Sequence, residues 1–167
     1  MDTTVTESVR AYIDTTGQRL RADGCEVKTE DWAGLPVLVG YRADFKLRWM
    51  ATKLHLFTIV APATSITESA MQAFTTSAFD YVLARKGQLR GLQSGVAVFP
   101  ALVGTQIEPR ALAWAQQKQQ VRFAALARPV VVDASTGAAG AFRSTTTLGF
   151  VYSAHLRRKL DCYFPAA

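Results

Sequence analysis

Residues that build metal sites and disulfide frameworks are scarce in this chain. Its 167 residues include two cysteines, Cys25 and Cys162, and two histidines, His55 and His155. The cysteines lie near opposite ends and no CxxC pair is present, so the ligands of a zinc site would have to come from distant segments. We predict no metal and no cofactor, with both thiols reduced and buried. A disulfide between the two ends of the chain is the alternative.

Motifs for nucleotide binding and for nucleophilic catalysis are also missing. Neither GxxxxGKS/T nor GxGxxG occurs, so the segment 135–137 is predicted to be a hairpin turn rather than a phosphate loop. No serine or cysteine is aligned with His55 as a nucleophile would be. We therefore predict no catalytic residue and favour a protein that is not an enzyme.

No apolar run approaches the roughly 20 residues that span a bilayer. The first residues, 1–4, are acidic and polar, and they lack the basic start and apolar segment of a secretion signal. This composition predicts a soluble protein without membrane contact, located in the cytoplasm.

Charge is sparse and unevenly distributed. Charged residues make up 19% of the chain, the net charge is +6 and the sequence pI is about 9.6. Residues 1–31 contain four Lys/Arg and seven Asp/Glu, whereas residues 32–167 contain fifteen and six. The excess of positive charge in residues 32–167 favours anionic partners. The alternative is that this charge serves only solubility and is neutralised by the acidic N-terminal helix. Hydrophobic residues, at 49%, suffice for one core, so we predict a single domain, 1–167.

Hydrophobic periodicity predicts a mixed α+β fold organised around a hairpin, 37–60. Alternate positions from Val39 to Trp49 are apolar, as in a strand with one buried face. Reversal at residues 50–51 would place Phe45 opposite Leu56 and leave the charged residues on the other face. A one-residue slip would turn every side chain of one strand over.

The remaining elements follow from spacing and caps. Helical spacing from Val9 to Leu20 predicts an N-terminal helix, and a short strand at 25–32 completes a three-stranded antiparallel meander with the hairpin. A capping box at Ser65 to Glu68 opens a long helix, 66–86, that crosses over to a parallel strand at 96–99. A helix at 109–118, short strands near 123–126, 130–132 and 141–143, and a C-terminal helix at 148–163 packed on the sheet complete the predicted order.

Charged positions of the hairpin form the first candidate site. The predicted register gathers them on one basic sheet face, with Asp44 orienting a neighbouring cation and Trp32 and Trp49 at its sides: Arg42, Asp44, Lys46, Arg48, Lys53 and His55. Such a face can bind phosphates or carboxylates, or it can be a solvated face with cross-strand charges. His55 beside Asp44 could also serve as a base with its orienting acid.

A second basic patch lies in the last helix and consists of Arg157, Arg158 and Lys159. These cations lie toward the C-terminal end of the helix, where the helix dipole favours positive charge. His155 precedes them and is interpreted as a surface histidine of the same helix.

The predicted order of helix, three strands, helix and strand resembles two known folds over roughly residues 5–103. It is similar to the core of the restriction-endonuclease-like superfamily, which needs an acid and a lysine on its third strand to hold Mg²⁺. Here that strand reads Thr52-Lys53-Leu54-His55-Leu56 without an acid, so the resemblance implies a degenerate form without the catalytic metal. The order also resembles the secretion-chaperone-like α/β fold, a protein-binding scaffold that needs no catalytic residues.

Three functional hypotheses follow. The first is a non-enzymatic interaction or scaffold module that presents its sheet face or last helix to a protein partner or to a second copy. The second is a nucleic-acid-binding domain that uses the basic sheet face and the second patch. The third is a small-molecule enzyme that uses His55 and Asp44.

Overall fold

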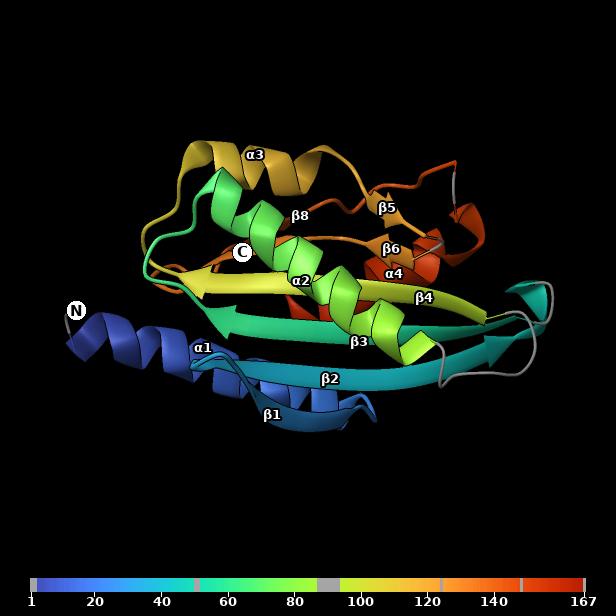
Figure 1. Cartoon of the computed structure of the whole chain (residues 1–167), viewed down its shortest axis with the longest axis horizontal. Coiled ribbons are helices and arrows are strands. Elements are labelled where there is room, and N and C mark those ends of the chain that lie inside the picture. The colour runs from blue at the N-terminus through green and yellow to red at the C-terminus, as the bar shows by residue number, and fades with distance from the viewer. Residues whose placement is uncertain (1–2, 50–51, 87–93, 124, 148, 167) are drawn as a thin grey trace.

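The computed structural model describes residues 3–49, 52–86, 94–123, 125–147 and 149–166 (Figure 1). Within these ranges the chain forms four helices and an eight-stranded mixed sheet. This arrangement confirms the predicted α+β class. None of the helices in the described ranges is long and apolar enough to cross a lipid bilayer.

The first half of the sheet is the predicted meander followed by a parallel strand. Its elements are β1 (Glu26–Trp32), β2 (Leu35–Lys46), β3 (Thr52–Pro62), α2 (Glu68–Lys86) and β4 (Ser94–Gly104). Strands β1, β2 and β3 pair in antiparallel fashion, and α2 leads to β4, which pairs with β3 in parallel. The predicted crossover is confirmed, and the strand predicted at 96–99 continues past Pro100 to Gly104.

The second half of the sheet contains a strand that is broken in two. β6 (Ala125–Ala127) and β7 (Val130–Asp133) both pair in parallel with β4, and the gap at Arg128 and Pro129 lies opposite Phe99 and Pro100. Proline has no N–H for a ladder bond, so the two prolines coincide with the interruption. Two short antiparallel strands, β5 (Gln120–Arg122) and β8 (Ala139–Ala141), flank β6 and β7.

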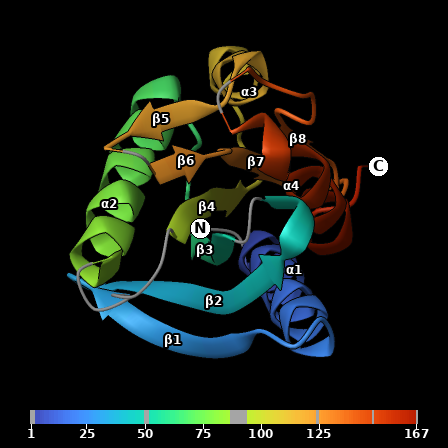
Figure 2. The ribbon, with the colours of Figure 1, turned by 90° about the vertical axis from the view of Figure 1, so that its right-hand side faces the viewer.

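Helices cover both faces of the sheet (Figure 2). α2 packs on one face together with α3 (Pro109–Gln117), and this core contains Phe74, Ala78 and Val82 of α2. α1 (Thr3–Ala22) and α4 (Phe150–Tyr163) pack on the other face, where Leu20 and Leu160 are fully buried. The C-terminal helix therefore lies on the sheet as predicted; its predicted start, Leu148, lies outside the described residues.

Helix α2 is capped by a different pair of residues from the predicted Ser65 and Glu68. Thr67 Oγ1 accepts a hydrogen bond from Ala70 N at 3.1 Å, and Glu108 Oε2 accepts one from Glu68 N at 2.9 Å. A threonine cap and a carboxylate at the positive end of the helix both stabilise this start. The cap thus also ties the entrance of α3 to the entrance of α2.

The register of the central hairpin differs from the prediction by three residues. Phe45 lies opposite Lys53, and Leu56 lies opposite Arg42, so Phe45 and Leu56 point to opposite faces of the sheet. The physical reason is the 3₁₀ turn η1 (Leu47–Trp49), which removes three residues from the predicted strand; the predicted reversal at 50–51 lies outside the described residues. An odd shift turns one strand over relative to the prediction.

Gly40 lies directly against Leu20 of α1, and a substitution there should be costly. A Cβ at this position would lie 2.9 Å from Leu20 Cδ1 and 3.2 Å from Leu20 Cδ2, and Leu20 is fully buried. We expect Gly40→Ala to lower the free energy of unfolding by about 2 kcal/mol through overpacking, measured by urea denaturation.

The matched control for this substitution is Gly17→Ala in α1. There the nearest atom to an added Cβ is Arg21 Nη1 at 3.3 Å, the end of a flexible side chain, and alanine favours a helix. Gly17→Ala should be neutral or slightly stabilising. Equal stabilities for the two variants would show that Leu20 does not pack tightly against β2.

Candidate interaction site

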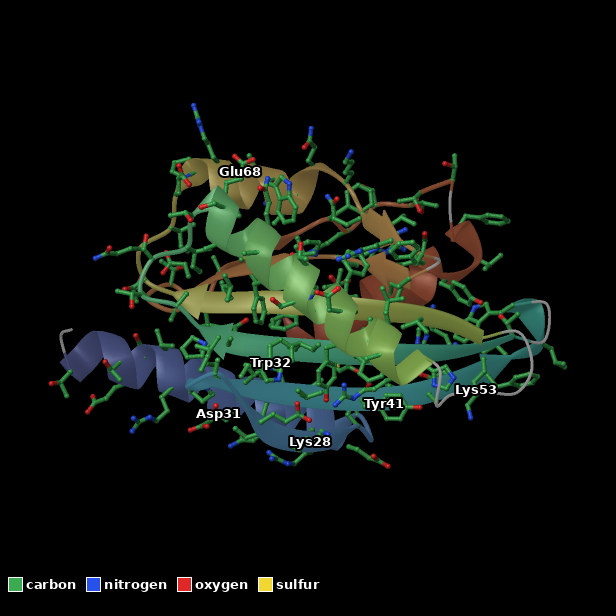
Figure 3. All side chains as sticks on the ribbon, in the orientation of Figure 1. Lys28, Asp31, Trp32, Tyr41, Lys53 and Glu68 are labelled. Atoms are coloured by element: carbon green, nitrogen blue, oxygen red, sulfur yellow. The ribbon has the colours of Figure 1, made fainter. Side chains whose placement is uncertain are left out.

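The sheet separates the residues of the predicted basic face. Arg42, Asp44 and Lys46 alternate on the side of α1 and α4, whereas Lys53 and His55 lie on the side of α2. Figure 3 shows Lys53 near the end of the sheet where β3 begins. The prediction of one shared face is therefore wrong, because it depended on the shifted register; the side chain of Arg48 lies outside the described residues.

The same separation removes the predicted pairing of His55 with Asp44. Asp44 lies opposite Leu54 and His55 lies opposite Ala43, so their side chains leave the sheet on opposite faces. His55 Nδ1 is instead 2.8 Å from Tyr41 Oη, and the two rings stack. Burial, and then the charge of Lys53, lower the pKa of His55. The enzyme hypothesis built on these two residues is wrong.

Arg42 is held by two carboxylates from different elements. Its Nε and Nη2 donate to Asp44 Oδ2 and Oδ1 at 2.7 and 2.6 Å, a bidentate pair within β2. Its Nη1 donates to Asp23 Oδ2 at 2.7 Å and also to the backbone oxygen of Asp23. Asp23 follows the end of α1, so this guanidinium connects the end of α1 to β2. The positive charge of Arg42 is therefore balanced by carboxylates of the same chain.

Helix α4 completes this network from the other side. Lys159 Nζ donates to Asp23 Oδ1 and Oδ2 at 2.9 and 2.7 Å, and the Tyr163 hydroxyl donates to Asp23 Oδ2. Cys25 Sγ lies 3.4 Å from Tyr163 Oη. Burial would raise the pKa of Asp23, but the hydrogen bonds from Lys159 and Tyr163 and the charges of Lys159 and Arg42 outweigh it and lower that pKa. The network joins residues from both predicted patches.

His155 is buried within this region rather than lying on the helix surface as predicted. It packs edge-on against Trp49, with ring centroids 4.9 Å apart, and its Nε2 is 3.4 Å from Asp44 Oδ2. This separation is within reach of an ion pair, yet Nε2 makes no hydrogen bond to any residue that the structure describes. Burial lowers the pKa of His155 to about 4, although Asp44 opposes this shift. At neutral pH the imidazole is therefore uncharged and does not pair with Asp44.

Comparison with known proteins adds no assignment. The chain matches no protein-family model and no curated protein.

Large apolar side chains are exposed at one end of the molecule. Phe45, Leu47, Phe123 and Phe150 are 55, 80, 76 and 65% exposed. They belong to the end of β2, to η1, to the connection between β5 and β6, and to the start of α4, which Figure 2 shows on the side facing the viewer. We call these four residues the apolar end. The predicted pattern had placed Phe45 and Leu47 in the core, so their exposure is a further consequence of η1.

Contacts between neighbouring elements hold this end together. Thr52 Oγ1 lies 2.7 Å from Tyr152 Oη, and Trp49 packs against Tyr152 at 5.3 Å, which joins η1 and β3 to the first turn of α4. At Gly149, just before α4, an added Cβ would lie 2.7 Å from Leu126 Cδ1, so α4 begins directly on β6. The apolar end is therefore supported by well-packed elements.

Basic residues surround the apolar end. Lys46 lies between Phe45 and Leu47 in the sequence and its Nζ is 5.2 Å from the Trp49 ring, while exposed Lys53 is the cross-strand neighbour of Phe45. Arg122 precedes Phe123 and pairs with Asp80 at 3.2 Å. In the second predicted patch, Arg157 and Arg158 are exposed on α4, whereas Lys159 belongs to the internal network.

Proposed function

We propose that this protein is a non-enzymatic interaction module that binds an acidic protein partner through the apolar end. The observation that carries this proposal is the exposure, between 55 and 80%, of Phe45, Leu47, Phe123 and Phe150 at one end of the fold. Exposed apolar side chains bordered by polar residues are typical of protein interfaces, and aromatic residues are enriched in the centres of such interfaces.

The charges around these residues favour an acidic partner over a second copy. In a symmetric dimer the same patch faces itself, so Lys46 and Lys53 of one copy would approach those of the other. Like charges brought together across an interface cost free energy, whereas acidic groups on a partner would be attracted and steered to the site. The uneven charge of the sequence, with fifteen Lys/Arg against six Asp/Glu in residues 32–167, supports the same choice.

Nucleic-acid binding is the second candidate, because Arg157, Arg158 and Lys53 are exposed and the sequence pI is about 9.6. It is less well supported, since Arg42 and Lys159 of the predicted contacts are already paired with Asp23 and Asp44. Phosphate-driven binding falls steeply as salt rises. A strongly salt-dependent mobility shift with DNA or RNA, unaffected by changes at the apolar end, would favour this alternative.

A direct test uses a labelled peptide in which Leu and Phe alternate with Asp and Glu, and a matched peptide with Lys at each acidic position. We expect the wild-type protein to bind the acidic peptide and not the basic one. Phe150→Glu and Leu47→Glu should each weaken binding at least tenfold, since each introduces a buried like charge at the contact. Fluorescence anisotropy measures the affinities.

The control is Thr76→Glu, an exposed substitution on α2, which should leave binding unchanged. Surface changes of this kind alter stability by about 0.5 kcal/mol or less, so thermal unfolding can verify that all variants are folded. Equal binding by Phe150→Glu and wild type would contradict the proposal. A wild-type dimer in light scattering that becomes a monomer on Phe150→Glu would assign the apolar end to a second copy instead.

A further inference from the structure

Arg128 is a cation buried in the interior without a carboxylate partner among the described residues. Its side chain is 1% exposed. Nε donates to Gln119 Oε1 at 3.0 Å, Nη1 to the backbone oxygen of Phe142 at 3.4 Å, and Nη2 to Ser153 Oγ at 3.4 Å. All three acceptors are neutral, and two of the bonds are long. Arginine is almost never fully buried unless it is paired.

Electrostatics around this guanidinium are unfavourable. Burial, and then the charge of Arg157, lower the pKa of Arg128 to about 10, so the side chain remains protonated at neutral pH. A buried charge that lacks an opposite charge destabilises the folded state. The Phe142 ring, 5.2 Å away, and the neutral acceptors offset only part of this cost.

The strand break explains how the guanidinium reaches this place. Arg128 lies in the gap between β6 and β7, and its backbone N donates a hydrogen bond to Val98 O at 3.0 Å. Its side chain lies on the same side as Leu126, against which α4 begins. Ser153 in the first turn of α4 accepts from Arg128 and also lies 3.5 Å from Thr146 N. The cation therefore lies beneath the N-terminal end of a helix.

The N-terminal end of helix α4 adds a second source of positive potential next to Arg128. Its N-cap is Gly149 in a left-handed conformation, with φ of 71°, and this residue has no side chain with which to cap the helix. The N-terminal end of a helix carries partial positive charge and attracts anions. A buried guanidinium next to this end, with the side chains of Ser153, Thr146 and Gln119 around it, is a set of groups suited to an oxyanion.

We propose that the cluster of Arg128, Gln119, Thr146 and Ser153 binds a small oxyanion of the phosphate class at the start of α4. Thr146 is partly exposed while Arg128 and Ser153 are buried, so the anion approaches past Thr146. The charge of the ligand neutralises Arg128, and its oxygens accept hydrogen bonds from the guanidinium and the hydroxyls. This site is separate from the apolar end and its test does not depend on the proposed partner.

The experiment measures binding of inorganic phosphate to the full chain by isothermal titration calorimetry, with chloride at equal ionic strength as the reference. We expect saturable binding with one phosphate per chain and a rise in unfolding temperature that chloride does not produce. Arg128→Gln should weaken phosphate binding at least tenfold. Arg110→Gln, which changes an exposed arginine of α3, should leave it unchanged.

Thr146→Ala provides a second variant in case Arg128→Gln does not fold, and should weaken phosphate binding several-fold. Titration with O-phosphoserine amide distinguishes the sources of the anion: tighter binding of inorganic phosphate assigns the site to the free ion, and the reverse assigns it to a phosphorylated ligand. No saturable phosphate binding by the wild type, or binding that Arg128→Gln and Thr146→Ala both leave unchanged, would overturn the proposal.

Discussion

Replacing Asp23 with asparagine is expected to lower the free energy of unfolding by about 3 kcal/mol, because it leaves Lys159 without its carboxylate and removes one of the two carboxylates that hold Arg42. Asp23 pairs with Arg42 at 2.7 Å and with Lys159 at 2.7 Å, and these side chains are mostly enclosed between α1, β2 and α4. Asparagine has nearly the same shape as aspartate, so packing is preserved. The loss of unfolding free energy therefore measures the contribution of the negative charge. Urea denaturation of both proteins, fitted with the same dependence of unfolding free energy on urea concentration, measures the difference in stability.

Asp161→Asn is the matched control for this prediction. Asp161 pairs with Arg143 at 2.6 Å, but its side chain is 56% exposed. An exposed pair of this kind contributes about 0.2–1 kcal/mol, so the control should lose no more than that. If Asp23→Asn and Asp161→Asn cost the same, the network around Asp23 is screened by solvent and does not hold α4 to the sheet.

The order of elements could be predicted because it depends on local signals. Helical spacing from Val9 to Leu20, the polar start of α2 near Thr67, and Pro109 at the first turn of α3 each specify an element within a few residues. The apolar run at 96–99 also indicated a strand covered on both faces. These features do not require knowledge of any distant residue.

The pairing of the central hairpin could not be predicted in the same way. Alternation from Val39 to Trp49 continues across the point where β2 ends at Lys46 and η1 begins. Trp49 turns back beneath α4, where it contacts His155 and Tyr152. Its burial comes from tertiary packing, which periodicity alone does not reveal. A loop without glycine or asparagine was the available sign that no tight two-residue turn forms there.

The internal ion network was hidden for a related reason. Asp23 next to Gly24 is a typical helix end, and nothing in its neighbourhood indicates a partner on β2 or α4. The sequence did contain Asp44 between Arg42 and Lys46, which indicated that Asp44 would orient a neighbouring cation; in the structure that cation is Arg42. What it could not indicate was that Lys159, 136 positions beyond Asp23, would reach the same carboxylate.

Acidification is expected to destabilise the protein through His155 before its carboxylates titrate. The pKa of His155 is lowered from 6.5 to about 4 in the folded protein, chiefly by burial. Between these values the unfolded chain takes up a proton at this position and the folded chain does not. The stabilisation is therefore fully present above pH 6.5 and is lost as the pH falls toward 4, by about 3 kcal/mol in total.

Carboxylates contribute in a different pH range, which allows the two effects to be separated. The pKa values of Asp23 and Asp44 lie below their ordinary value of 3.8, and that of Glu30 is about 2. Their stabilisation is present above their unfolded pKa values and is lost only when the pH falls through these lower values. Between pH 4.5 and 6.5 the histidines therefore dominate the change.

His155→Gln tests this assignment, since glutamine does not titrate and its amide can replace the neutral imidazole beside Trp49. The variant should show a much flatter dependence of unfolding free energy on pH between 4.5 and 6.5, even if its stability at pH 7 is lower. His55→Gln is the comparison, because the pKa of His55 is also lowered by burial and contributes with the same sign. An unchanged pH dependence in His155→Gln would mean that His155 can be protonated in the folded protein. The separation of 3.4 Å from Asp44 would then have to close into a real ion pair.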